Sequence, residues 1–248
     1  MVGLIYKDLC CLKKNIKVFI LVTLATMALS ILFILSMKYG NVALMIADMS
    51  EEEFFGFFQT AIWCVLVLPI ASSAMIQECF KEDTKANFKK CLYALPVKEE
   101  KMVGGRYMSG LVFLFLGFLG TLAASVCISF ATDAFKFTQL LSYCITFLAA
   151  VIMYEAFVMF VLYTVDGKKA DLIQCVPLVV LLFGGMYFFA NEVTDMSDEQ
   201  FMEFSINMMD KANDLMMKYC IWILLGALLL MGISYAGSVF MQKRRGVN

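Results

Sequence analysis

Six apolar runs, each about 20 residues long, constrain the fold of this chain more than any other feature, because a helix of that length crosses a lipid bilayer. They occupy residues 18–37, 58–77, 104–130, 139–165, 172–191 and 218–241. Hydrophobic residues make up 62% of the 248-residue chain and charged residues 17%, whereas a soluble domain is about 45–50% apolar and about 25% charged. The sequence therefore predicts an all-α integral membrane protein with about six transmembrane helices. No linker-like segment divides the chain, so we expect a single domain over residues 1–248.

The distribution of positive charge predicts which way the helices cross the membrane. All but four of the 20 Lys and Arg residues fall in the N-terminal segment, in residues 78–106, in the link after the fourth run or in the C-terminal tail; the exceptions are Lys38, Lys136, Lys211 and Lys218. Those four segments lie on one side of a six-helix topology. Because cytoplasmic loops carry an excess of Lys and Arg, we expect both termini to be cytoplasmic.

The composition disfavours several kinds of catalytic and metal site. The chain has no histidine, which excludes Ser-His-Asp and Cys-His nucleophile systems and histidine-containing zinc sites. Its nine cysteines include no C-x-x-C pair, so we interpret them as reduced, mostly buried small apolar residues. No catalytic residue and no metal site is predicted.

An amphipathic helix is predicted at residues 3–16, before the first apolar run. Its apolar residues share one face; they are Leu4, Ile5, Leu9, Leu12 and Ile16. Such a helix lies flat in the membrane interface with its lysines near anionic lipid. The alternative is a simple cytoplasmic extension of the first transmembrane helix.

The loop at residues 78–106 contains a second predicted short helix. Asp83 or Thr84 would cap it, and Pro96 would end it. Its apolar ridge has spacing i, i+4, i+7 and consists of Phe88, Leu92 and Leu95, flanked by Lys85, Lys89 and Lys90. A ridge of this kind with basic edges suits contact with a soluble partner. A helix resting on the membrane surface is the alternative, and the residues alone do not separate the two.

Glu155 is the one acidic or basic residue deep within a predicted transmembrane helix. An acid at mid-membrane costs about 2.5–3.5 kcal/mol on insertion scales, so we expect it to face protein or water. Two roles are open: a hydrogen bond to a serine or tyrosine of a neighbouring helix, or a place on a substrate path.

Two further segments predict helix packing and an external helix. The third apolar run carries small residues four apart, Gly117, Thr121, Ser125 and Ser129, which permit close helix approach in lipid. Residues 197–200 form a capping box that would open a helix outside the membrane, before the last run.

Two segments resemble the bacterial type-two ABC transporter permeases. Residues 83–110, DTKANFKKCLYALPVKEEKMVGGRYMSG, are similar to the family's loop, in which a short helix ends in Leu-Pro-Val and a charged run leads to Arg-Tyr. Residues 162–173, LYTVDGKKADLI, are similar to the family's link between the fourth and fifth spans. The six-span plan and the short basic N-terminal helix also agree.

The resemblance implies a membrane subunit of a bacterial cytoplasmic-membrane exporter that binds a separate cytoplasmic ABC ATPase dimer and a second permease copy or paralogue. Residues 84–95 would be the coupling helix, with the contact made by Phe88, Lys89, Leu92, Leu95 and Pro96. Relatives export amphipathic or antimicrobial peptides, so the expected partners include membrane lipid and an amphiphilic substrate, and no nucleic acid. The sequence has no G-x-x-x-x-G-K-[ST] motif, so ATP and Mg²⁺ are expected on the ATPase, and no cofactor on this chain.

Two other classes of function were considered. A membrane enzyme such as an intramembrane protease is disfavoured, because the chain lacks histidine and no single run contains paired acids. A membrane immunity protein that sequesters an antimicrobial peptide without transport is compatible with the sequence.

Overall fold

The structure is a computed structural model, and it describes residues 2–11, 13–39, 98–131, 136–165, 167–193 and 198–246 together with the single residues Leu66, Phe80 and Asp83. Every element formed by these residues is an α-helix. The protein is thus an all-α membrane protein, as the sequence predicts.

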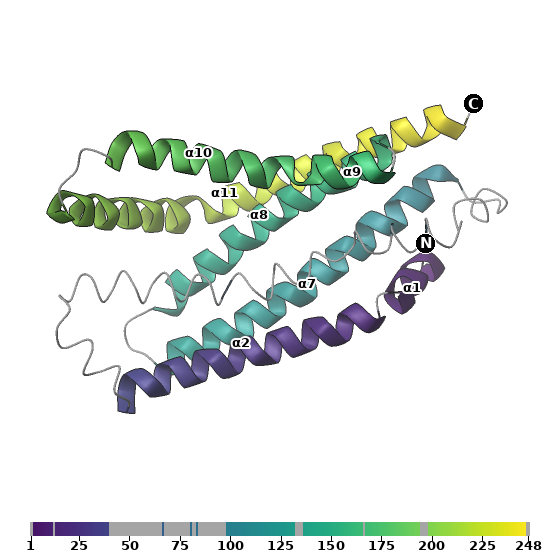
Figure 1. Cartoon of the computed structure of the whole chain (residues 1–248). Helices are drawn as coiled ribbons and strands as arrows, with labels where there is room; N and C mark the ends of the chain where they lie inside the picture. The colour runs from purple at the N-terminus through teal and green to yellow at the C-terminus, as the bar shows by residue number, and fades with distance from the viewer. Residues whose placement is uncertain are drawn as a thin grey trace.

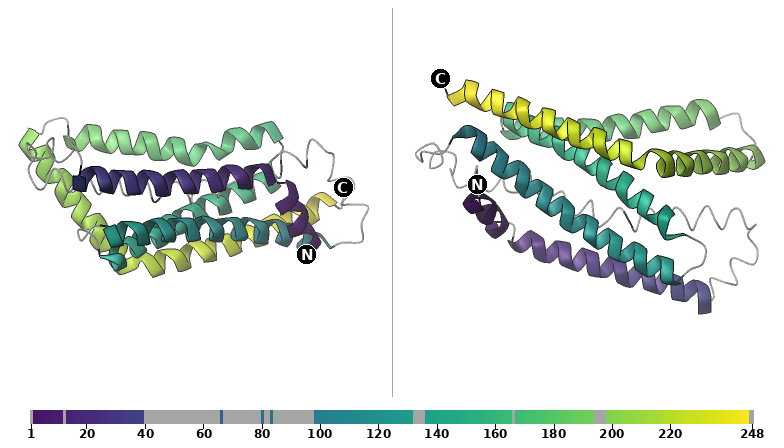
Figure 2. Two further views of the ribbon diagram at one scale, coloured as in Figure 1. Left: turned by 90° about the horizontal axis from the view of Figure 1, so that it is seen from below. Right: turned by 180° about the vertical axis from the view of Figure 1, so that it is seen from behind.

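Seven helices make up the described part of the chain: α1 (Val2–Cys11), α2 (Lys13–Tyr39), α7 (Glu99–Ala131), α8 (Phe137–Thr164), α9 (Gly167–Gln174), α10 (Val176–Val193) and α11 (Asp198–Gly246). The long helices run roughly lengthwise in an elongated bundle (Figure 1). The two chain ends lie at the same end of this bundle in all three views (Figures 1 and 2). We call it the terminal end and the other the far end.

Five of the six predicted spans coincide with described helices: α2, α7, α8, α10 and the C-terminal part of α11. Three helical stretches are long and apolar enough to cross a membrane, Glu99–Ser129, Phe137–Thr164 and Ile206–Arg244, and two shorter apolar stretches lie at Ile16–Leu29 and Leu172–Tyr187. The predicted span at 58–77 lies outside the described residues, apart from Leu66.

Helices α7, α8 and α11 form the centre of the bundle. Their apolar side chains build a buried cluster that includes Val103, Leu114, Ile152, Met159 and Ala227. Helices α8 and α11 approach closely. A Cβ added at Gly237 would lie 2.9 Å from the Phe160 ring, nearer than real Cβ contacts allow, so glycine makes room for that ring.

The predicted ridge of small residues on α7 is a packing surface. Gly117, Thr121 and Ser125 are buried, and the Thr121 hydroxyl donates to the Leu66 carbonyl at 3.2 Å and to the Gly117 carbonyl at 3.1 Å. Residue 66 belongs to the second predicted span. The ridge therefore brings that point of the chain against α7, as small residues do in membrane helix pairs.

Helix α1 is a separate helix that meets α2 at an angle (Figure 1). Its polar residues are not all turned away from the protein: Asp8 is buried and Lys7 half-buried, whereas Tyr6 is 69% exposed. Lys7 therefore pairs with Asp83 within the protein, whereas the sequence predicts that the lysines of this helix lie near anionic lipid. The physical reason for the burial of Asp8 is that α7 offers Arg106 and Ser109 as partners for Asp8.

Helix α11 is longer than the sequence suggests. The predicted external helix after Ser197 and the last span at 218–241 form one helix, Asp198–Gly246, which bends along its length (Figure 2). At 1.5 Å per residue its 49 residues measure about 70 Å, and about 20 residues suffice to cross a bilayer. The first turns of α11 thus continue the bundle at its far end.

A neutral hydrogen-bond network holds α11 to α8 at the far end. The Gln139 amide donates to the Tyr143 hydroxyl at 2.7 Å, and this hydroxyl donates to the Asn213 side-chain oxygen at 2.6 Å. Tyr143 and Asn213 are both buried. We refer to Gln139, Tyr143 and Asn213 as the neutral network.

Helix α10 begins after a turn at Cys175 and shows a strongly apolar surface. Pro177 is its second residue, where a missing N–H costs little. Leu181, Phe183 and Tyr187 are each at least 68% exposed, which is expected for a helix whose solvent is lipid rather than water.

Candidate functional site

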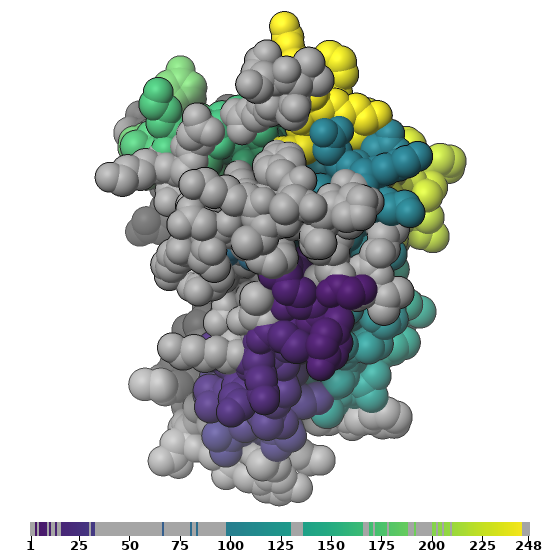
Figure 3. Space-filling view, turned by 90° about the vertical axis from the view of Figure 1, so that its right-hand side faces the viewer, coloured from purple at the N-terminus to yellow at the C-terminus, as the bar shows by residue number. Residues whose placement is uncertain are grey.

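The candidate site is a set of buried charges at the terminal end, where α1, residue 83 and the first turns of α7 meet. Its members are Lys7, Asp8, Asp83 and Arg106, which we call the ion cluster. The first turns of α7, α1 and the end of α11 all reach this end of the molecule, as the end-on view shows (Figure 3). The predicted coupling residues Phe88, Lys89, Leu92, Leu95 and Pro96 lie outside the described residues.

Local sequence places α7 so that it can present Arg106. The helix begins at Glu99, three residues after Pro96, and its first turn holds Glu99 and Glu100, whose negative charge suits a helix N-terminus. Arg106 follows about two turns later. It is 8% exposed and faces α1 rather than solvent.

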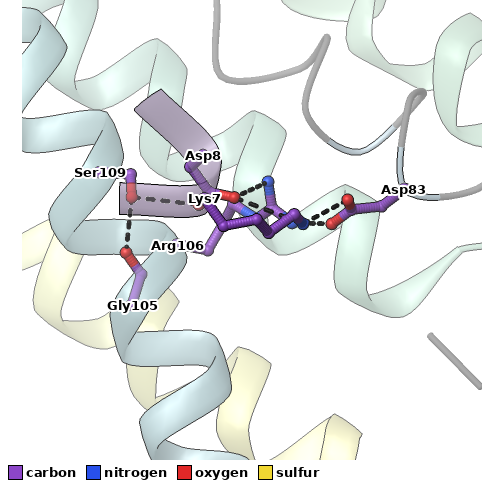
Figure 4. Close-up of polar contacts among 6 residues, drawn as sticks. All are labelled: Lys7, Asp8, Asp83, Gly105, Arg106 and Ser109. Carbon is purple, nitrogen blue, oxygen red and sulfur yellow. Dashed lines mark hydrogen bonds and ion pairs between the residues drawn. The ribbon is translucent and has the colours of Figure 1, made fainter. Parts of the chain in front are cut away.

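Arg106 forms ion pairs with two carboxylates from different parts of the chain, and the one with Asp83 is also a hydrogen bond (Figure 4). Its Nη1 lies 3.0 Å from Asp8 Oδ1 on α1, and its Nη2 donates to Asp83 Oδ2. The guanidinium also lies over the Phe80 ring, 4.7 Å from its centroid, a cation–π contact. The planar guanidinium suits this arrangement, because its two terminal nitrogens reach different carboxylates at once.

Lys7 and Ser109 complete the contacts of the two carboxylates (Figure 4). Lys7 Nζ donates to Asp83 Oδ1 and lies 3.6 Å from Asp8 Oδ1. The Ser109 hydroxyl lies 3.1 Å from Asp8 Oδ2, to which it donates. Asp8 therefore meets α7 at two positions, one helical turn apart.

Burial decides the electrostatics of the cluster. It raises the pKa of the Asp8 carboxyl above its ordinary value, while Arg106, Lys7 and the Ser109 hydroxyl act to lower it. A buried charge is tolerated when it is paired and hydrogen-bonded, and removing one partner is strongly destabilising. The cluster thus ties α1, residue 83 and α7 together through interactions that are costly to break singly.

Tyr107, the next residue along α7, points to the other side and bonds α11. Its hydroxyl lies 2.7 Å from the Ser234 hydroxyl and 2.9 Å from that of Ser238. The Ser234 hydroxyl also donates to the Ala156 carbonyl of α8 at 2.5 Å. One turn of α7 therefore contacts α1 and residue 83 through Arg106, and α11 and α8 through Tyr107.

Glu155, the neighbour of Ala156, is deeply buried. Its side chain is 1% exposed, and neither carboxyl oxygen has a hydrogen-bond partner in the part of the chain that the structure describes. The nearby hydroxyls of Ser234 and Tyr107 bond one another instead. Glu155 lies nine residues before the end of α8, or about 13 Å along the helix axis, so it is nearer the terminal end than the far end.

Exposed polar contacts also join α7 to α11 at the terminal end. Lys243 Nζ lies 2.6 Å from Glu100 Oε1, and the Tyr235 hydroxyl donates to the Glu100 carbonyl at 3.3 Å. Both side chains of the Lys243–Glu100 pair are 52% exposed. Solvent screens such a pair, so it contributes little to stability.

The ion cluster is not predicted from the sequence. Lys7 and Arg106 fall among the charges that predict the topology, and Asp83 occupies a predicted helix cap. The available signal was the presence of acids inside two strongly basic segments, Asp8 in the N-terminal helix and Asp83 in the loop. Among the described residues, no group of three His, Cys, Asp or Glu side chains could hold a metal ion.

The helices and the ion cluster together define an all-α membrane protein with buried charges at one end. Comparison with protein families gives the particular family: the model described as "ABC-2 family transporter protein" matches residues 3–243. The chain therefore belongs to the ABC-2 family, whose members are membrane permeases of ABC transporters. No curated protein and no solved structure matches the chain.

Proposed function

We propose that this protein is the membrane-spanning subunit of an ATP-driven exporter that moves amphipathic or antimicrobial peptides, or other amphiphiles, out of a bacterial cell. The observation that carries the proposal is the family match over residues 3–243. Permeases of this family act with an ABC ATPase. The sequence itself has no Walker A motif, so the nucleotide and Mg²⁺ would bind to a separate ATPase dimer.

The basic end of the chain is the proposed ATPase side. Positive residues concentrate in α1 and the first turns of α2, before and in the first turns of α7, in α9 and in the last turns of α11. This excess marks the cytoplasmic side of a bacterial membrane protein. Residues 84–95 would form the coupling helix in this position. ATP-driven closure of the ATPase dimer would move it, and a path between two permease copies would then open outward.

Glu155 is proposed to face the translocation path in the open state. Its carboxyl is buried without a hydrogen bond in the described structure, and a buried polar group that lacks a partner requires an explanation. In membrane proteins, an intramembrane acid is most often a functional group. A carboxyl that meets a passing cationic or polar substrate provides that explanation.

The coupling-helix assignment is tested by Leu92→Asp, with Leu92→Met as a matched control of similar size. Leu92→Asp would bury an unpaired charge at the contact, so it should leave a stable membrane protein that no longer co-purifies with its ATPase. Leu92→Met should co-purify as the wild type does. The measurement is co-purification in detergent followed by an ATPase assay. Equal recovery of the ATPase with Leu92→Asp would contradict the assignment.

The role of Glu155 is tested by Glu155→Gln, with Glu100→Gln as a control acid at the exposed start of α7. The amide keeps an acceptor and the side-chain shape, so expression should be normal. On the proposed role, ATP-dependent protection of cells against a cationic amphipathic peptide falls for Glu155→Gln and not for Glu100→Gln. Unchanged protection with Glu155→Gln would remove Glu155 from the path.

The second candidate is an immunity protein that binds an antimicrobial peptide without transport. The two functions differ in their need for ATP hydrolysis. Protection that persists when the partner ATPase carries an inactivated catalytic residue would favour the immunity protein. Protection that disappears under the same change would favour the exporter.

A further inference from the structure

We propose that Arg106 and Tyr107 form a mechanical connection that makes α1 move with the ATPase-facing loop and transmits this movement to α11 and α8 beside Glu155. Both are positioning residues, because neither is assigned contact with nucleotide or substrate. The inference rests on the proposed function for the part that concerns the ATPase. The connection between α1 and α7 stands independently of it.

The first step of the connection joins both ends of the loop. Asp83 lies near the start of the loop at residues 78–106, and Arg106 lies at its end, 23 positions later; the two are bonded to each other. A segment whose ends are bonded cannot change the separation of those ends without breaking a buried ion pair. A force on the loop is therefore delivered to α7 at Arg106.

The second step brings α1 into the same unit. Arg106 Nη1 lies 3.0 Å from Asp8 Oδ1 in an ion pair, and the Ser109 hydroxyl donates to Asp8 Oδ2 at 3.1 Å. Lys7 bridges from α1 to Asp83. Helix α1 is thus attached to both α7 and residue 83 (Figure 4), and it is a separate helix from α2. Its movement should follow the loop.

The third step crosses α7 to the centre of the bundle. Tyr107 packs edge-to-face on Tyr235, with ring centroids 5.5 Å apart, and its hydroxyl bonds Ser234 and Ser238. Ser234 in turn bonds the carbonyl of Ala156, the residue after Glu155. A rotation or shift of α7 at positions 106–107 therefore displaces the segment of α8 that carries Glu155.

Two variants separate the steps. Arg106→Lys keeps the positive charge but replaces the guanidinium with a single ammonium, which cannot contact both Asp8 and Asp83 as the two guanidinium nitrogens do. Tyr107→Phe keeps the ring contacts and removes the hydroxyl. Lys243→Gln is the matched control, because it removes a charged contact between α7 and α11 at the same end of the bundle but on its exposed surface.

The first measurement uses the full-length permease alone and follows amide hydrogen exchange in α1, residues 2–11, and in α8. Arg106→Lys should raise the exchange rate of α1 about tenfold, because the buried ion pair with Asp8 is lost, without altering that of α8. Tyr107→Phe and Lys243→Gln should leave α1 unchanged. Unaltered α1 exchange in Arg106→Lys would overturn the connection, whether or not an ATPase binds the wild type.

The second measurement uses the permease–ATPase complex and compares bound ATPase with permease-stimulated hydrolysis. Arg106→Lys and Tyr107→Phe should each retain the ATPase in wild-type amount and lose permease-dependent stimulation by about the same tenfold factor, whereas Lys243→Gln should keep both. Stimulation that persists in Arg106→Lys or in Tyr107→Phe would overturn transmission through that residue. If the wild-type permease binds no ATPase, the proposed function is contradicted, and so is transmission of movement from an ATPase. The hydrogen-exchange measurement still decides whether α1 is attached to α7 through Arg106.

Discussion

The two ends of the bundle are held together by different chemistry. At the terminal end, four charged side chains from α1, residue 83 and α7 pair with one another; Asp8, Asp83 and Arg106 are buried and Lys7 is half-buried. At the far end, the neutral network joins α8 to α11 through Gln139, Tyr143 and Asn213. Both arrangements pair buried polar groups, but they differ in the free energy of unfolding that is lost when one partner is removed.

The difference indicates where the protein transmits movement and where it is only held in place. A neutral hydrogen bond contributes about 0.5–1.5 kcal/mol net, whereas breaking a buried ion pair by removing one partner costs about 3–5 kcal/mol. The ion cluster also joins segments that are distant in sequence, on either side of the loop. We infer that the terminal end moves as one unit, while the far end provides ordinary helix packing.

The largest expected effect is the loss of stability in Arg106→Gln. This change leaves Asp8 and Asp83 buried with one cation fewer, and it should lower the free energy of unfolding by about 3 kcal/mol or more. Thermal unfolding in detergent measures it, with Gln139→Ala at the far end as the comparison. A smaller loss for Arg106→Gln than for Gln139→Ala would remove the distinction between the two ends.

A smaller effect is expected at the far end from Tyr143→Phe. The substitution keeps the buried ring and removes the hydroxyl that donates to the Asn213 oxygen, so the loss in the free energy of unfolding should be about 1–2 kcal/mol. The same unfolding assay applies. A loss as large as that of Arg106→Gln would show that the neutral network is equally important for stability.

A pH effect should distinguish the charged end further. Because the pKa of Asp8 is raised in the folded protein, the folded state binds a proton at Asp8 at a pH where the unfolded chain does not. Its contribution to stability therefore grows as pH falls from neutrality towards its ordinary value of 3.8. The unfolding free energy of the wild type minus that of Asp8→Asn should increase over this range, and a decrease would indicate a lowered pKa.

The smallest expected effect belongs to the exposed pair at the terminal end. Lys243→Gln removes a contact with Glu100 that solvent already screens, so the unfolding temperature should not change measurably. The assay is repeated at low and high salt. A clearly lower unfolding temperature of Lys243→Gln at low salt would mean that an exposed ion pair also contributes to stability at this end.

Much of the fold was predictable from the sequence, because hydrophobic length is a strong signal in membrane proteins. Five of the six predicted spans coincide with helices, and three of the four small residues on α7 are buried as expected; they are Gly117, Thr121 and Ser125. The continuity of α11 was not predicted, since a capping box at residues 197–200 and an acid-rich stretch suggest a separate helix. No signal at residues 205–217 breaks the helix, as they include neither Gly nor Pro.

The ion cluster was not predictable by the same reasoning, because periodicity does not report which distant charges meet. Asp8 lies on a helix whose apolar face suggested a membrane surface, and Asp83 occupies a plausible capping position. Arg106 looked like one more charge at the membrane boundary. Their pairing depends on how α1 folds back onto α7, which no local pattern in either segment specifies.

A soluble ATPase can reach only the end of the bundle that faces the cytoplasm, and we expect this to be the terminal end. Single cysteines at exposed positions test this: Lys101→Cys at the terminal end and Asp210→Cys near the far end, each in a background without the nine native cysteines. The measurement is labelling of intact cells with a membrane-impermeant thiol reagent. The account predicts labelling of the cysteine at position 210 in intact cells, and of the one at position 101 only after permeabilisation. The reverse pattern would contradict it.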